Sequence, residues 1–336
     1  MTKKILSSLI CLTLLISLCG CGKKGEEQGE VEQAKEPEKQ LKIVNLKSKT
    51  RPYAVMINNN HAAWPQAGIQ DAYIVYEIVV EGGITRMMAL YKDAQTAKIG
   101  SIRSSRHYFL DYALENDAIY VHFGWSPKAQ SDISTLKINN INGLYDSCFW
   151  RDKTLKRAYE HTAFTNIEKL NETTKKKGYR TETDKDLLLN YSVDELDLSS
   201  KEGAIPANNV TIKYSNYHTT SYEYDSENKV YKRTMSRVPN TDLDSGVQYT
   251  AKNIITYKVE DTALPDTENK GRRDLKNIGS GEGYYITDGY AVPITWEKSS
   301  RSAQTIYKYK DGSEIVVNDG NTFIQIQPLN QALTIE

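Results

Sequence analysis

The two halves of the chain differ in their pattern of hydrophobic positions. Between residues 51 and 180, continuous apolar runs such as YAVMIN (53–58) and IVYEIVVE (74–81) alternate with helical stretches. Continuous apolar runs are typical of buried strands, and strands that alternate with helices are typical of layered α/β domains. We therefore predict an α/β domain with a mixed sheet over residues 51–200.

Three helices are predicted in this domain. The first runs from about Ser105 to Glu115, the second begins after Ser126-Pro127, and the third covers residues 165–179 and is closed by Gly178. Serine before proline suits the cap and first position of a helix, and glycine suits its end. The run AIYVHF (118–123) is predicted to be the strand before the second helix.

The second half consists of short alternating runs that are separated by turn dipeptides. Examples are VTIKY (210–214), NIITYKV (253–259) and the turn Asp288-Gly289. This spacing predicts a mainly antiparallel β domain over residues 208–330, joined to the first domain near residues 199–209. The predicted fold class is therefore α+β or α/β.

The N-terminal residues resemble an export signal with a lipid-attachment site. The apolar run Ile5–Leu18 is shorter than the roughly 20 residues of a membrane-spanning helix, and it ends at Cys19-Gly20-Cys21. We predict a signal peptide over residues 1–20, lipidation at Cys21 and a disordered charged tether over 21–50. A plain secretory signal that is cut elsewhere is the alternative.

Charge and cysteine content exclude several classes of protein. The 43 basic and 43 acidic residues give no general attraction for nucleic acid. Cys11 and Cys19 lie in the predicted signal and Cys21 is the predicted anchor, so only Cys148 remains, which we interpret as a buried hydrophobic residue. We find no zinc, nucleotide or nucleophile motif, and we expect no cofactor and no metal.

Charged residues in the predicted hairpin 74–91 indicate a site. If Gly82-Gly83 forms a two-residue turn, Glu77 faces Met88, and Glu77, Glu81 and Arg86 share one face of the hairpin. Charges in such an apolar run must be paired or must face a wet cleft. A structural ion-pair network and a binding cleft both fit this arrangement.

The segment GSIRSSRHYF (100–109) places Arg103, Arg106 and His107 at the predicted helix start. The start of a helix carries partial positive charge, so these cations need an anion nearby. Either Glu77 and Glu81 supply it, or a bound phosphate, sulfate or carboxylate does.

His122 is a further candidate because it ends the predicted strand 118–123. Open α/β sheets usually bind ligands where strand ends face helix starts. A satisfied core histidine is the alternative. The candidate ligand-binding residues are thus Glu77, Glu81, Arg86, Arg103, Arg106, His107 and His122.

The order of several motifs closely resembles the YerB-type lipoproteins of Gram-positive bacteria. These motifs are RPYAVMINN, VEGGITRMMALY, GSIRSSRHYF, VHFGWSP, GYYITDGYAVPITWEK and DGNTFIQI, and the resemblance covers Arg51 to about Pro328. It implies a lipoprotein with an N-terminal domain of unknown function and a distinct C-terminal domain. It implies no catalytic residues.

The sequence therefore favours a lipid-anchored protein on the extracytoplasmic face of the membrane. We expect it to bind or scaffold a cell-envelope component through an anion-tolerant cleft in the first domain, and we expect no nucleic acid. The expected partners are the membrane, an anionic envelope polymer or its precursor, and envelope proteins. The alternatives are an envelope hydrolase or transferase that acts on a glycan or phosphodiester, and a protein-interaction adaptor.

Overall fold

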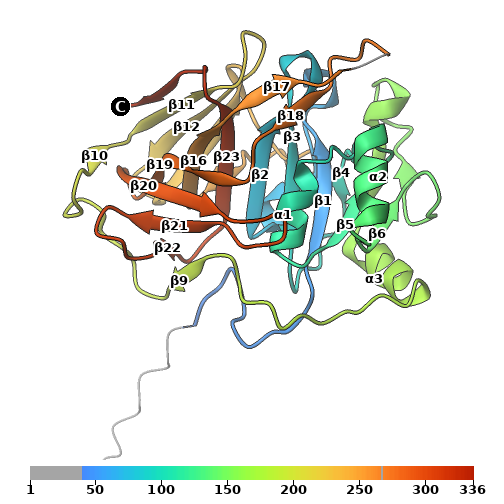
Figure 1. Ribbon diagram of the computed structural model, residues 1–336, viewed down its shortest axis with the longest axis horizontal. Helices are drawn as coiled ribbons and strands as arrows, with labels where there is room; N and C mark the ends of the chain where they lie inside the picture. Colours follow the sequence, from blue (N-terminus) through green and yellow to red (C-terminus); the bar gives the residue numbers. More distant parts are fainter. Residues whose placement is uncertain (1–39, 266–267) are drawn as a thin grey trace, which may run out of the picture. The chain divides into compact units, whose positions relative to one another are not determined.

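The fold is built on an 11-stranded mixed sheet that uses strands from both halves of the chain (Figure 1). The computed structural model describes residues 40–265 and 268–336. The strands of the sheet are, in spatial order, β10 (Ile205–Pro206), β20 (Tyr290–Lys298), β19 (Gly279–Thr287), β16 (Asn253–Val259), β23 (Thr322–Pro328), β2 (Ile74–Val79), β3 (Thr85–Tyr91), β1 (Tyr53–Asn58), β5 (Ile119–His122) and β6 (Asn140–Asn142), with β21 (Ile306–Tyr309) against β20.

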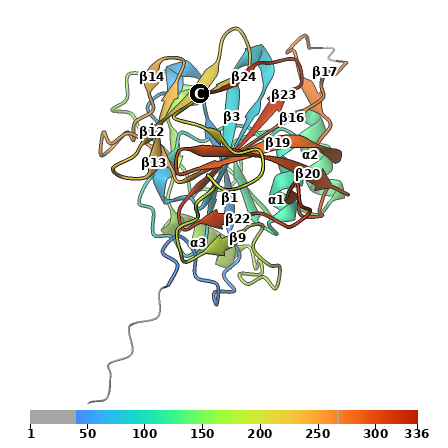
Figure 2. The same ribbon diagram turned by 90° about the vertical axis from the view of Figure 1, so that its left-hand side faces the viewer.

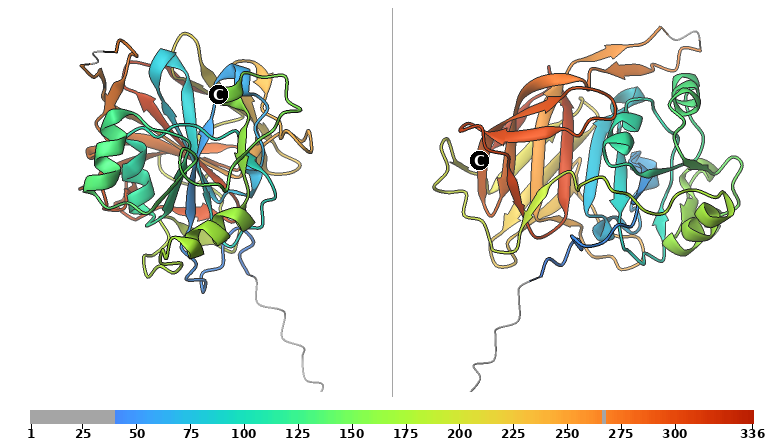
Figure 3. Two further views of the ribbon diagram at one scale, coloured as in Figure 1. Left: turned by 90° about the vertical axis from the view of Figure 1, so that its right-hand side faces the viewer. Right: turned by 60° about the horizontal axis from the view of Figure 1, so that its bottom comes forward.

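Strand β23 joins the two halves of the chain. It pairs in parallel with β2 on one side and with β16 on the other, and every residue of β2 and β23 is buried. Strands that are covered on both faces read as continuous apolar runs rather than as alternating ones. In Figure 3 the strands of the first half lie between the C-terminal strands and the helices α2 and α3.

A second sheet of six strands packs on one face of the central sheet. Figure 2 shows β12 and β13 on one side of the molecule and α1 and α2 on the other. The second sheet consists of β14 (Val238–Pro239), β13 (Val230–Met235), β12 (Thr219–Asp225), β11 (Asn209–Lys213), β24 (Leu333–Ile335) and β15 (Thr250–Ala251). The first half thus has a mixed sheet with helices, and the second half is mainly antiparallel, as predicted.

Short elements complete the fold. The helices are α1 (Phe109–Glu115), α2 (Pro127–Thr135) and α3 (Ile167–Lys176). The short turns of 3-10 helix are η1 (His61–Ala63), η2 (Ile69–Asp71), η3 (Glu81–Gly83) and η4 (Tyr159–His161). The small sheets pair β4 (Ile99–Gly100) and β7 (Trp150–Arg151) with β8 (Ala163–Thr165), β9 (Asn190–Ser192) with β22 (Val316–Asn318), and β17 (Asp261–Ala263) with β18 (Arg273–Leu275).

The helix predictions are confirmed for two of the three helices. Ser126 caps α2 by accepting a hydrogen bond from the backbone N–H of Ala129, and Gly178 follows α3 with a φ of 65°. The first helix begins at Phe109 and not near Ser105, so that prediction was wrong at its start. Arg103, Arg106 and His107 therefore precede the helix.

The folded part of the chain begins earlier than the sequence suggested. Residues 40–50, which we assigned to the tether, pack against the fold: Val44 is buried, and Asp319 accepts hydrogen bonds from the backbone N–H groups of Lys42 and Ile43. The predicted signal peptide and Cys21 lie outside the described residues. No helix in the described part of the chain is long and apolar enough to cross a membrane. The domain boundaries stay predictions.

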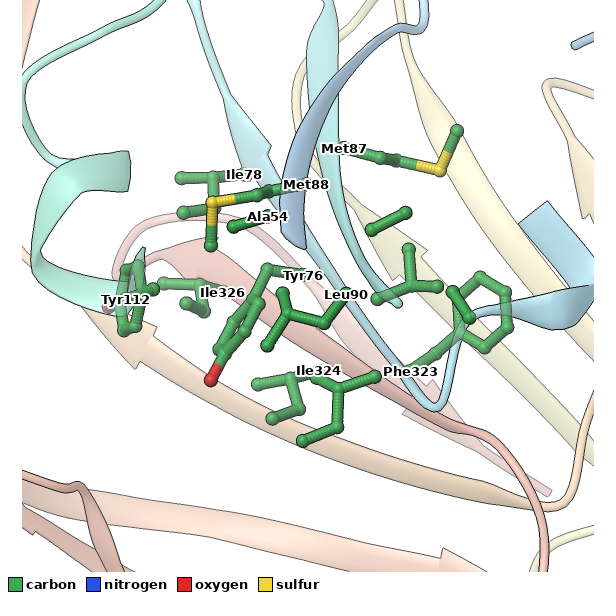
Figure 4. Packing of buried hydrophobic residues seen from close by; sticks show 14 of the residues in the cluster. Ala54, Tyr76, Ile78, Met87, Met88, Leu90, Tyr112, Phe323, Ile324 and Ile326 are labelled. Atoms are coloured by element: carbon green, nitrogen blue, oxygen red, sulfur yellow. The ribbon is translucent and has the colours of Figure 1, made fainter. Parts of the chain in front are cut away.

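The register of the hairpin differs from the predicted one by one residue. The backbone N–H of Val80 bonds to the carbonyl of Ile84, so the loop has three residues rather than two, and Glu77 pairs with Met87. Because side chains alternate along a strand, this shift places Arg86 on the opposite face of the sheet from Glu77. In Figure 4, Met88 and Ile78 lie on the side of α1, and Met87 points the other way.

Glu77 forms the centre of a buried polar network between the two sheets. Its side chain is fully buried, and one carboxylate oxygen accepts a hydrogen bond of 2.7 Å from Nη2 of Arg233 in β13. The other oxygen is contacted by Thr85, Thr220, Asn59 and His218 at 2.7–3.2 Å.

The charges around Glu77 keep this carboxylate ionised. Burial raises the pKa of Glu77, but Arg233 and His218 outweigh that effect and hold the pKa well below its usual value. The network therefore holds the two layers of the fold together, and the partner of Glu77 is Arg233 of the second sheet rather than Arg86 of the hairpin.

Replacement of Glu77 by Gln should strongly destabilise the protein. The change leaves the buried guanidinium of Arg233 without its counter-charge, which typically costs about 3–5 kcal/mol. Chemical denaturation of residues 40–336 at neutral pH measures the loss. A matched change at the partly exposed Glu81 should cost less, and equal losses for the two variants would contradict a central role for Glu77.

The same network predicts an acid-labile fold. Because the folded-state pKa of Glu77 is depressed, its contribution to stability is present above the unfolded pKa of about 4.3 and is lost as the pH falls through the folded pKa. The free energy of unfolding should therefore fall below about pH 4. The Glu77→Gln variant should show a shallower acid dependence, and an unchanged slope would count against the assignment.

Candidate functional site

Four arginines gather at the ends of β1 and β3, next to the segment that precedes α1. We call Arg86, Arg103, Arg106 and Arg151 the arginine cluster. Glu81, in the turn η3, accepts hydrogen bonds from two nitrogens of Arg106, one of them at 2.8 Å, and lies 3.8 Å from Arg86. The structure thus brings two of the predicted residues, Arg86 and Arg106, together around Glu81.

Arg86 is the most deeply buried member of the arginine cluster. It is 5% exposed, its Nη1 donates to the carbonyl of Ser104, and its Nε has no partner in the described part of the chain. Burial lowers the pKa of Arg86 to about 9, and the positive charge of Arg106 adds to the decrease. The lowered pKa reflects the burial of this guanidinium first and the nearby positive charge of Arg106 second.

Arg103 forms the more accessible edge of the cluster. Its Nη2 contacts the carboxylate of Glu160 at 3.3 Å, and the side chains of Arg103 and Glu160 are 28% and 57% exposed. Burial lowers the pKa of Arg103, and Arg106 and Arg151 add to this effect against the opposing charge of Glu160. The pair is therefore a surface ion pair within a positive environment.

Arg151 extends the cluster along an aromatic surface. Its guanidinium lies 4.4 Å from the ring centroid of Phe123 and 4.0 Å from that of Tyr159, and it donates to the carbonyl of Tyr159 at 2.6 Å. Arg86, Arg103 and Arg106 thus share the two carboxylates of Glu81 and Glu160, and Arg151 adds a further positive charge near Arg103.

A neighbouring ion pair does not change the net charge around the arginine cluster. Arg273 pairs with Asp261 at 2.6 Å, so it adds no net charge next to the cluster. The arrangement can attract and hold an anion by guanidinium hydrogen bonds. It holds no residue set for a cofactor, and the described residues contain no group of three or more His, Cys, Asp or Glu that could hold a metal.

His107 lies apart from the arginine cluster. Its Nε2 is 2.6 Å from Oδ1 of Asp274, and it lines a pocket of about 250 Å³ together with Asp111 and Arg301. Burial lowers the pKa of His107, against the opposing effect of Asp274. His107 therefore does not form a shared anion-binding site with Arg103 and Arg106.

His122 is a satisfied core histidine, the alternative that the sequence left open. It is fully buried, and its ring nitrogens contact the carbonyl of Gly124 at 2.8 Å and Oδ1 of Asn140 at 3.2 Å. Burial lowers the pKa of His122 to about 4, so it is neutral at physiological pH. It supports neighbouring side chains rather than facing a ligand.

The sequence analysis missed the histidines that lead from Glu77 to the surface. Nδ1 of His218 lies 3.3 Å from Nε2 of His61, and the His61 ring stacks on the exposed Tyr217 at 4.3 Å. Burial lowers the pKa of His61, and His218 lowers it further. His61 lies in η1 and His218 directly precedes β12, so no local pattern links them, and only the packing of the two sheets brings them together.

Comparisons with known proteins agree with the observed architecture. Residues 41–180 match the model described as "Protein of unknown function (DUF3048) N-terminal domain", and residues 210–324 match the C-terminal domain of the same description. The chain is 29% identical to "Putative lipoprotein YerB" of Bacillus subtilis (strain 168), over 97% of this chain and 96% of that protein.

A solved structure supports the same relationship. The crystal structure of YerB protein from Bacillus subtilis matches with a TM-score of 0.73 and 27% identity, over 85% of this chain and 94% of that chain. The sequence resemblance is thereby confirmed along nearly the whole length of both proteins. The chain therefore belongs to the DUF3048 family of YerB-like proteins.

Proposed function

We propose that this protein is a lipid-anchored, extracytoplasmic protein that binds an anionic component of the cell envelope at the arginine cluster. The observation that carries the proposal is the charge balance, in which Arg86, Arg103 and Arg106 share the carboxylates of Glu81 and Glu160 and Arg151 adds its charge near Arg103. The name of the YerB relative and the segment Leu18–Cys21 support the lipid anchor.

Arg103 is the residue best suited to bind an external anion. Its partner Glu160 is more than half exposed, and exposed ion pairs contribute only about 0–1 kcal/mol. A phosphate or carboxylate can therefore replace Glu160 at little cost, and the planar guanidinium matches both groups with two parallel hydrogen bonds.

The nearly buried Arg86 strengthens this site from below. Among the described residues its ion-pair partner is the shared Glu81 at 3.8 Å, so its field adds to that of Arg103 and Arg106. Fields from partly buried charges are screened less than those of exposed groups, so this contribution persists at physiological salt. Anionic wall polymers and phosphorylated precursors carry the groups that such a site recognises.

The structure gives no support to an acid–base pair formed by Glu77 and Glu81. Glu77 is fully buried and paired with Arg233, and Glu81 is held by Arg106. The two carboxylates also belong to different networks, because Glu77 pairs with Arg233 and Glu81 pairs with Arg86, which points away from Glu77. The proposed role is accordingly binding rather than catalysis.

Arg103→Ala should abolish anion-specific stabilisation while leaving the basal Tm nearly unchanged. Pyrophosphate should raise the Tm of the wild type above that in chloride of equal ionic strength, because a ligand that binds only the folded state stabilises it. Thermal-shift assays measure both effects. Arg180→Ala, which breaks the exposed pair with Asp117, is the matched control and should retain the pyrophosphate shift.

Two results would contradict this site. One is a wild type that responds to pyrophosphate no more than to chloride. The other is an Arg103→Ala variant that keeps the full shift. If Arg103→Ala simply unfolded, the cluster would be structural, because a surface pair alone cannot supply that much stability.

Cys21→Ala should prevent lipidation and release the protein from the membrane. The segment Leu18–Cys21 supplies the only predicted attachment cysteine. Metabolic labelling with a palmitate analogue, followed by fractionation of the cells, measures both effects. Equal labelling of wild type and variant would refute lipidation at this residue, and Cys148→Ala serves as the control that should keep the label.

A further inference from the structure

A second pocket, separate from the arginine cluster, lies at the ends of β5 and β6 beside α2. We call it the Trp125 pocket; it has a volume of about 530 Å³, within the range of roughly 300–1,000 Å³ of small-molecule sites. Its lining combines two aromatic rings, two buried isoleucines and several amide side chains. This composition is that of a ligand site with an apolar wall and a few orienting polar groups.

The aromatic wall is formed by Trp125 and Tyr145. Their ring centroids are 5.8 Å apart with an angle of 45° between the planes, and Tyr145 is 73% exposed. The buried ring of His122 supports Trp125 from below at 5.5 Å. A large exposed aromatic side chain with a fixed neighbour offers a surface on which the C–H face of a sugar ring can stack.

Asn142, which lines this pocket, carries an unsatisfied donor. Its side chain is 2% exposed, and its Oδ1 accepts hydrogen bonds from the backbone N–H groups of Gly124 and Leu144 at 3.0 and 3.1 Å. Its Nδ2 has no partner among the described residues. Buried polar groups are almost always hydrogen-bonded, so this donor calls for an acceptor from a ligand or from water.

The charges of the pocket are mostly compensated within it. Asp146 accepts hydrogen bonds from Nζ of Lys177 at 2.9 Å and from the backbone N–H of Asn142 at 2.8 Å. Lys137 is the remaining charged residue of the lining, and it is exposed. The pocket therefore fits a neutral ligand better than a strongly anionic one.

We infer that the Trp125 pocket binds an N-acetylhexosamine ring of a glycan. The C–H face of the sugar would stack on Trp125 and Tyr145, and the acetamido carbonyl would accept the free hydrogen bond of Asn142. The acetamido methyl would pack against the buried Ile133 and Ile138 of the same pocket.

This inference does not rest on the proposed anion site. The segments that carry the two sites nevertheless lie side by side. The backbone N–H of Phe123 bonds to the carbonyl of Arg103, and that of Ser126 bonds to the carbonyl of Ser105. An envelope glycan that carries anionic groups has the chemistry to use both, with its sugar in one site and its charge in the other.

Calorimetric titration of residues 40–336 with triacetylchitotriose tests the inference. Binding should be detectable at millimolar sugar, and maltotriose, which lacks the acetamido group, should bind more weakly. Tyr145→Ala should weaken chitotriose binding about three- to tenfold, because one of the two stacking rings is lost. The exposed Tyr217, which does not line the pocket, provides the control Tyr217→Ala, which should bind as the wild type does.

Several outcomes would overturn the sugar site. These are the absence of chitotriose binding, equal binding by Tyr145→Ala and wild type, and binding of an uncharged peptide in place of the sugar. Arg103→Ala should leave chitotriose binding unchanged and lose only the pyrophosphate response. A failure of the sugar site is therefore distinguishable from a failure of the proposed anion site.

Discussion

The buried ion pair between Glu77 and Arg233 is the interaction on which the rest of the structure depends. Both side chains are fully buried, and they join β2 of the central sheet to β13 of the second sheet. Either charge alone would be very costly at this position, so the two sheets can pack only when the pair forms. The polar groups of Thr85, Thr220, Asn59 and His218 complete the network and fix the register of the layers.

That register also decides where the remaining charge lies. Because Glu77 points toward the second sheet, Arg86 points toward the opposite face, where Arg103 and Arg106 approach it from the segment before α1. The carboxylate of Glu77 pairs with Arg233 inside the fold. The arginines of the cluster pair instead with Glu81 and Glu160. The core network and the anion-binding proposal therefore follow from the same pairing of β2 with β3.

Much of the fold could be predicted from local patterns. The hairpin, two of the helices, the mixed sheet and the antiparallel second half follow from hydrophobic periodicity, turn dipeptides and caps. The loop length could not, because Gly82-Gly83 also fits the three-residue turn that includes Glu81. The additional residue in the loop shifts the register by one, so Arg86 lies on the opposite face of the sheet from Glu77. The predicted site residues therefore fall into two separate groups.

Contacts between residues that are distant in sequence could not be predicted from local patterns. Arg233 and β23 meet β2 only after the second half has folded onto the first, and no nearby residue signals either contact. Asn142 was missed for a similar reason, since no local pattern shows that its Nδ2 lacks a partner or that it lines a pocket beside α2. Local patterns predicted Glu81, Arg86, Arg103 and Arg106 of the candidate site, and they missed Arg151, Glu160 and the pocket beside the site.

The anomalous difference map of a crystal of residues 40–336 soaked in selenate shows whether the arginine cluster binds an external anion. We predict a selenium peak within hydrogen-bonding distance of the Arg103 guanidinium, with the Glu77–Arg233 pair intact. The absence of a peak at Arg103, with Glu160 still paired to it at saturating selenate, would contradict the claim that this cluster carries charge for an external anion.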